Sequence, residues 1–129
     1  MSLRDYLFYE EPGITLYCGD CREVLPLLDS NTVDLVLPDP PFSVPIKYED
    51  AEGVHPRSWG DLLVMEPCFR EVFKELQRIT KATGQVYIHC DGDSYPVFYK
   101  TAYPYWPQSH LLVWYKPTGR RGRGWLHSH

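Results

Sequence analysis

Four consecutive residues, Asp39-Pro40-Pro41-Phe42, are the part of the sequence best suited to chemistry. The amino group on a nucleic-acid base is a poor nucleophile, because its lone pair is delocalised into the ring. The Asp39 carboxylate and the Pro40 carbonyl could each accept one N–H bond from such an amine and draw its nitrogen toward sp3 geometry. The rigid diproline would hold that carbonyl in place before the substrate binds, and Phe42 offers a face for a flipped base. The same residues could also form a simple turn, since proline and aspartate favour turns.

The residues before this tetrapeptide predict the strand that positions Asp39. Residues 33–37 (Val-Asp-Leu-Val-Leu) form a compact apolar run typical of a β-strand. Prolines at positions 38, 40 and 41 remove three backbone donors, so no regular ladder can continue there. Asp39 would therefore stand at the carboxyl end of a strand, which is the edge of an open α/β sheet where ligands bind.

Hydrophobic periodicity predicts the other elements. We expect a strand over 14–18 after a Pro12-Gly13 turn, a short helix over 21–28, a long loop over 43–57 and the longest helix from 58 to 79, with Pro67 kinking it or marking its first turn and Gly84 as its stop. A strand over 85–90, a helix over 95–102 capped by Ser94, a strand over 110–115 and a basic, glycine-rich tail over 116–129 follow. This alternation predicts one α/β domain with a mostly parallel sheet and flanking helices.

Composition limits the classes of function. The net charge of -4 argues against binding nucleic acid through overall charge, although Arg120, Arg121 and Arg123 provide a local basic cluster. No apolar run approaches the roughly 18 residues of a membrane span. The first residues lack the apolar core of a secretory signal. We therefore expect a cytoplasmic protein with reduced cysteines and no membrane partner.

The motifs resemble those of the amino-methylating DNA methyltransferases, which make N6-methyladenine or N4-methylcytosine. One block comprises Leu-Tyr-Cys-Gly-Asp-Cys at 16–21, a helix ending in Leu27-Leu28, the strand over 33–37 and the tetrapeptide over 39–42. A second block comprises Trp-Tyr-Lys at 114–116 and residues 122–129. The resemblance covers most of residues 14–129 and implies a Rossmann-like fold of the kind that uses S-adenosylmethionine.

The resemblance also implies roles for individual residues. Asp39, Pro40, Pro41 and Phe42 match the catalytic motif of the family, written there as Asp-Pro-Pro-Tyr or Asp-Pro-Pro-Phe. Asp20 matches an acidic residue that faces the adenine ring of S-adenosylmethionine, in a pocket that Cys21 and Asp39 would also line. Asp91 would lie on the same sheet edge, and Arg120, Arg121 and Arg123 would approach the phosphates of double-stranded DNA.

The reaction implied is direct methyl transfer to an exocyclic amine, as in restriction-modification systems, with no metal and no covalent enzyme intermediate. Adenine N6 is the expected target, because this motif accompanies N6 chemistry more often, and cytosine N4 is the alternative. Two family features are absent: no Phe-x-Gly-x-Gly cofactor loop and no target-recognition segment follow. We therefore expect an incomplete enzyme whose strand over 14–18 lacks its family neighbours, leaving apolar edges exposed. A homo-oligomer or a missing C-terminal half would complete it.

Two other interpretations stay open. Cys18 and Cys21 have the spacing of zinc ligands, and Cys90, His89, His127 and His129 could complete a site, but no second pair of this kind exists and we expect no metal. Alternatively, Arg120 to Arg123 with Trp114, Tyr115 and Trp125 could serve a noncatalytic remnant that binds nucleic acid or protein. No GxSxG, Walker or HExxH motif indicates a hydrolase.

Overall fold

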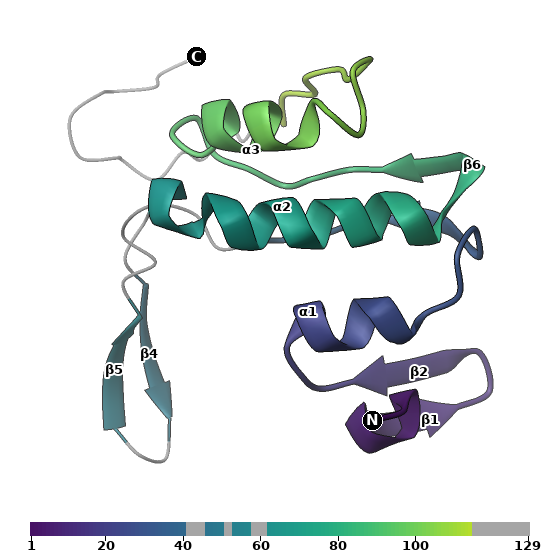
Figure 1. Cartoon of the computed structure of the whole chain (residues 1–129). Helices are drawn as coiled ribbons and strands as arrows, with labels where there is room; N and C mark the ends of the chain where they lie inside the picture. The colour runs from purple at the N-terminus through teal and green to yellow at the C-terminus, as the bar shows by residue number, and fades with distance from the viewer. Residues whose placement is uncertain (41–45, 51–52, 58–61, 115–129) are drawn as a thin grey trace.

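The computed structural model describes residues 1–40, 46–50, 53–57 and 62–114 (Figure 1). In chain order the elements are the 3₁₀-helix η1 (Leu3–Tyr6), strands β1 (Leu7–Glu11) and β2 (Ile14–Tyr17), helix α1 (Cys21–Val24), the 3₁₀-helix η2 (Leu25–Leu27), strands β3 (Val33–Val36), β4 (Ile46–Asp50) and β5 (Gly53–Arg57), helix α2 (Leu62–Ile79), strand β6 (Thr80–Val86) and helix α3 (Tyr95–Ala102). The fold is mixed α/β, with a small parallel sheet and flanking helices. Over the described ranges, no helix combines the length and the apolar character needed to cross a membrane.

Strands β3 and β6 form the parallel pair that positions the tetrapeptide. Val33 pairs with Thr80, and Leu35 and Val36 pair with Gln85 and Val86, so residues 81–84 of β6 form an irregular bulge. The ladder continues beyond the strand ends, because the Tyr87 N–H donates to the Val36 carbonyl at 2.9 Å and the His89 N–H donates to the Pro38 carbonyl at 3.1 Å. This pair is parallel, as expected of the sheet, but the strand expected over 85–90 begins earlier, at Thr80, and ends at Val86.

Helix α2 ends where expected, but Gly84 is not its stop. The helix ends at Ile79, and its last carbonyls accept hydrogen bonds from the turn before β3, namely Asn31 N–H to Arg78 O at 3.1 Å and Thr32 N–H to Ile79 O at 2.9 Å. Gly84, which we expected to stop the helix, lies in the bulge of β6. A Cβ there would lie 3.0 Å from the Asp34 carbonyl oxygen, so glycine permits close approach of the two strands. Pro67 lies inside α2, beyond its first turn.

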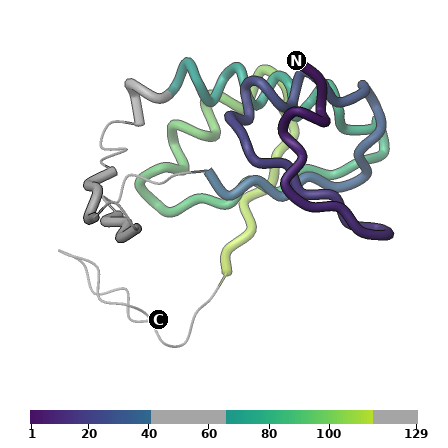
Figure 2. Tube along the Cα trace, turned by 90° about the horizontal axis from the view of Figure 1, so that it is seen from below, coloured from purple at the N-terminus to yellow at the C-terminus, as the bar shows by residue number. Residues whose placement is uncertain are grey.

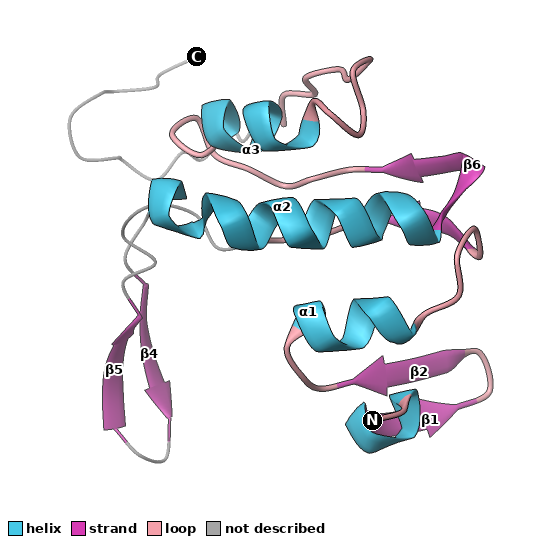
Figure 3. Ribbon diagram, in the orientation of Figure 1, coloured by secondary structure: helices cyan, strands magenta, loops and turns pink. Residues whose placement is uncertain are grey.

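The core gathers along one stripe of α2. Its apolar residues recur at steps of three and four, which is the spacing of one helical face. The buried apolar residues are Phe69, Phe73, Leu76 and Ile79 of α2 and Phe98 of α3. Val33 and Val36 of β3 and Ile88 beyond β6 pack against this cluster. Helix α2 therefore covers one face of the β3–β6 pair, with α3 beside it (Figure 3).

The opposite face of this pair carries exposed apolar side chains. Leu35, Leu37 and Tyr87 are exposed, whereas their neighbours Val36 and Ile88 point into the core. This alternation follows from the two-residue period of a strand. It places every second residue after β3 and β6, including Asp39 and His89, on the face that α2 does not cover.

Three expectations about strands are wrong. The described strands form three separate two-stranded sheets rather than one. The strand at 14–17 pairs antiparallel with β1, which the mixed composition of the first residues did not reveal; Gly13, with φ of +86°, makes the connecting turn. The segment expected as a loop over 43–57 contains the antiparallel hairpin β4–β5.

The expected strand over 110–115 is also wrong for its described part. Residues 110–114 form no strand, and Leu111, Leu112, Val113 and Trp114 are exposed. Figure 2 shows the yellow end of the described chain projecting from the body of the molecule. A strand gains stability from burying one face, and these four apolar side chains are exposed.

Candidate catalytic site

Asp39 lies just beyond β3, at the carboxyl end of the parallel pair. The carbonyl of the preceding residue, Pro38, is the last described acceptor in the ladder with β6, at 3.1 Å from the His89 nitrogen. Prolines at positions 38, 40 and 41 remove backbone donors, so a regular ladder cannot continue through this stretch. The Asp39 side chain is 75% exposed, so its carboxylate is accessible to a ligand. This is the display at a strand end that the sequence predicts.

His89 is the residue that the structure brings to Asp39. Its Nδ1 lies 3.0 Å from Asp39 Oδ1, a hydrogen-bonding distance, and its side chain is 49% exposed. The two side chains meet because positions 39 and 89 lie on the same face of neighbouring parallel strands. The sequence assigns His89 no role in this site and indicates it only as a possible zinc ligand. The signal that reveals it is the register, since pairing residues 36 and 86 carries positions 39 and 89 to one edge.

Asp91 has a structural role instead of an open position on this edge. Ser94, which is fully buried, donates from its backbone N–H at 2.7 Å and from its hydroxyl at 2.6 Å to Asp91 Oδ1. The Asp91 carbonyl accepts from the Tyr95 N–H at 3.0 Å. We expected the Ser94 side chain to cap α3. It does not, because its hydroxyl bonds to Asp91 instead. Asp91 therefore holds the start of α3.

Asp20 and Cys21 lie at the start of α1, away from the parallel pair. The Asp20 side chain caps α1 by accepting from the Arg22 N–H at 2.9 Å, and its Oδ2 forms an ion pair with Arg22 Nη2 at 2.6 Å. These bonds lower the pKa of Asp20 to about 2. Desolvation raises the pKa of the Cys21 thiol. The strand before Asp20 belongs to the β1–β2 hairpin, so the two aspartates do not share a sheet.

Several predicted site residues lie outside the described residues. These are Pro41, Phe42 and the basic cluster Arg120, Arg121 and Arg123. The zinc hypothesis also involves His127 and His129, which lie there too. Among the side chains that the structure does describe, no three His, Cys, Asp or Glu residues are grouped so that they could hold a metal ion.

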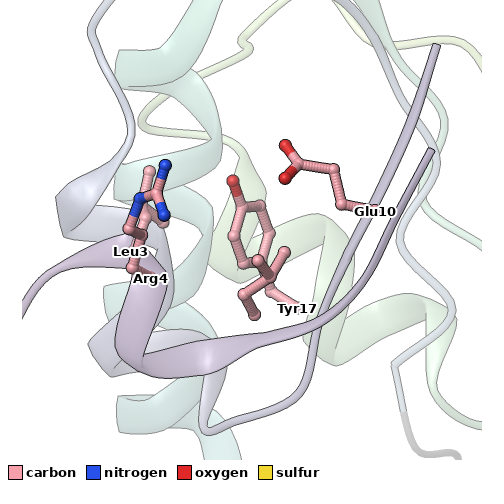
Figure 4. Close-up of a pocket in the computed structure, with 5 residues that line it drawn as sticks. Leu3, Arg4, Glu10 and Tyr17 are labelled. Atoms are coloured by element: carbon pink, nitrogen blue, oxygen red, sulfur yellow. The ribbon is translucent and has the colours of Figure 1, made fainter. Parts of the chain in front are cut away.

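Two small pockets occur elsewhere on the described surface. One of about 150 Å3 lies at the N-terminal hairpin, where the Tyr17 ring stands between Arg4 and Glu10 (Figure 4). Another of about 190 Å3 lies between η2 and α2, beside Arg22 and Glu71. Neither is lined by Asp20, Cys21, Asp39 or Pro40.

Comparison of the chain with protein-family models, with curated proteins and with solved structures gives no match in any of the three.

Proposed function

We propose that this chain is the catalytic part of an amino-methylating DNA methyltransferase with an incomplete Rossmann-like fold. The observation that carries the proposal is the position of Asp39-Pro40 at the carboxyl end of β3, beside a parallel neighbour. A simple surface turn does not require a parallel strand pair on its N-terminal side, with one face packed against the core. The residues of the tetrapeptide are those that amine chemistry needs, in the place where α/β sheets bind ligands.

The chain's own part in the reaction is to bind and polarise the amine. Asp39 would accept one N–H of an adenine 6-amino group and the Pro40 carbonyl the other, drawing the nitrogen lone pair out of the ring. The carboxylate also stabilises the positive charge that develops on the nitrogen as it is alkylated. The 75% exposure of Asp39 leaves room for a base flipped out of double-stranded DNA.

S-adenosylmethionine is the methyl donor that this proposal implies, and the described residues do not fit it. The Asp20 carboxylate is engaged by Arg22 and by the start of α1, and neither described pocket includes Asp20, Cys21 or Asp39. The described residues are therefore proposed to bind the substrate amine and not the methyl donor. A second copy or a C-terminal half would supply the donor side.

The test is methyl transfer to mixed-sequence double-stranded DNA. The full chain is incubated at high concentration with tritiated S-adenosylmethionine, and the DNA is digested to nucleosides. We expect label in N6-methyladenine. Asp39→Ala should abolish it, whereas Asp34→Ala should not, because Asp34 is equally exposed at 76% but lies before the strand end.

Other results would change the proposal in defined ways. Label in N4-methylcytosine would move the target to cytosine. Transfer that survives Asp39→Ala would contradict the mechanism. No transfer, together with DNA binding that falls steeply with salt and ignores Asp39→Ala, would favour the noncatalytic remnant.

A further inference from the structure

The backbone and the ring of His89 each make a contact that places the ring beside Asp39. Its backbone N–H donates to the Pro38 carbonyl at 3.1 Å, and its Nδ1 lies 3.0 Å from Asp39 Oδ1. The first contact belongs to the sheet ladder, so the register of β3 and β6 sets the position of the ring. The second joins a ring on one strand end to a carboxylate on the next.

We propose that His89 is the positioning residue for Asp39: its Nδ1–H donates to Oδ1 and leaves Oδ2 directed to the substrate amine. This inference rests on the proposed function. Hydrogen-bonding partners of this kind commonly orient the carboxylates and imidazoles that contact a reacting group. His89 lies 50 positions from Asp39 in the sequence and is not part of the tetrapeptide.

Asp39 needs such a partner because its surroundings constrain only its backbone. Prolines before and after it restrict the main chain, but the side chain is 75% exposed and can rotate. Among the described residues, no other hydrogen bond to the Asp39 carboxylate accompanies the one from His89. A carboxylate that must meet a small amine from one side benefits from a fixed orientation before the base arrives.

The donor state of the ring follows from this arrangement. A carboxylate is an acceptor only, so the nitrogen that faces Asp39 must carry the proton. In the neutral ring that is the Nδ1–H tautomer.

Substitutions at position 89 separate positioning from a merely structural role. His89→Ala removes the donor and should lower the rate of methyl transfer by about 10- to 100-fold at saturating DNA, with the DNA concentration for half-maximal rate changed less than twofold. His89→Asn places an amide N–H near the position of Nδ1 and should restore the rate to within about threefold of wild type. His89→Gln, whose amide extends further from the backbone, should not restore it.

The controls use the same chain. His110→Ala removes an exposed histidine from the segment after α3 and should leave the rate unchanged. Thermal melting of each variant by circular dichroism shows that the fold is retained. If His89→Ala fails to fold, the rates of methyl transfer of His89→Asn and His89→Gln test the positioning role instead.

A measurement without DNA or donor tests the geometry itself. Nitrogen-15 NMR of the histidine rings in the full chain should show His89 in the Nδ1–H tautomer, and Asp39→Ala should shift its population toward Nε2–H. An Nε2–H tautomer in the wild-type protein would overturn the inference, as would full activity of His89→Ala. If the wild-type chain transfers no methyl group, the proposed function is wrong and the positioning role with it. If the wild-type chain and His89→Ala are equally active, only the positioning role is wrong.

Discussion

Phe73 offers the sharpest test of the fold, because it is the best buried large side chain of the core. It is 1% exposed, and its ring centroid lies 6.3 Å from that of Phe69, 6.1 Å from that of Phe98 and 6.3 Å from that of Trp106. These contacts join α2, α3 and the residues after α3. We expect Phe73→Ala to destabilise the whole core and not one element alone.

The size of the effect follows from these contacts. Burial of a phenyl side chain contributes about 1.5 to 3 kcal/mol, and each aromatic pair adds about 0.5 kcal/mol or more. Together they predict a loss of about 4 kcal/mol, within the range of about 3 to 5 kcal/mol seen for buried phenylalanine truncations. With a urea m-value of about 2 kcal/mol/M, the unfolding midpoint should fall by about 2 M.

The assay is urea unfolding, measured by circular dichroism for the helices and by tryptophan fluorescence for the core, since Trp106 lies beside Phe73. Phe8→Ala is the matched control: it removes the same atoms from a side chain that is 75% exposed on β1. It should cost less than about 1 kcal/mol. If Phe73→Ala is unfolded without urea, Phe73→Leu, which keeps most of the volume, should cost about 1.5 kcal/mol. Equal midpoints for Phe73→Ala and Phe8→Ala would refute this description of the core.

Three further predictions concern the residues that connect the elements. Arg78 donates to the carbonyls of Leu25 and Leu28 at 3.0 and 2.9 Å, so Arg78→Ala should cost about 2 to 3 kcal/mol in urea unfolding. Gly84→Ala should cost about 1 to 3 kcal/mol in the same assay, because the new Cβ would lie 3.0 Å from the carbonyl oxygens of Asp34 in β3 and Lys81 in β6; a neutral effect would contradict this close approach of the two strands. Carbon-13 NMR should give a pKa of about 2 for Asp20, below its ordinary value of 3.8, with Arg22→Ala raising it. Because the folded value is the lower one, the stabilisation from Asp20 is present above about pH 4 and is lost as the pH falls toward 2, and an unchanged pKa in Arg22→Ala would show that Arg22 is not its cause.

Local sequence rules predicted the elements whose signals are local. The apolar run before Pro38 predicted β3, the three- and four-residue spacing of apolar side chains predicted α2, and the prolines predicted the end of the strand at which Asp39 is displayed. In each case the information lies within a few consecutive residues, because steric restrictions and strand or helix periodicity act over that range.

Pairing was harder to predict, because a strand's partner depends on residues far from it. The β1–β2 hairpin involves residues without clear alternation, and residues 110–114 have the composition of a strand but do not form one. The helix stop was missed for a related reason. Gly84 resembles a C-terminal cap in sequence, but the carbonyls at the end of α2 are satisfied by Asn31 and Thr32.

The sequence by itself determined that a carboxylate between two prolines stands at the end of a strand, because proline geometry and apolar patterning are properties of the local chain. Only the tertiary structure decided what surrounds them. The parallel register of β3 and β6 brings His89 to 3.0 Å from Asp39, while Ser94 binds Asp91 within the turn that begins α3. Such contacts depend on strand pairing and register, which composition and periodicity alone do not specify.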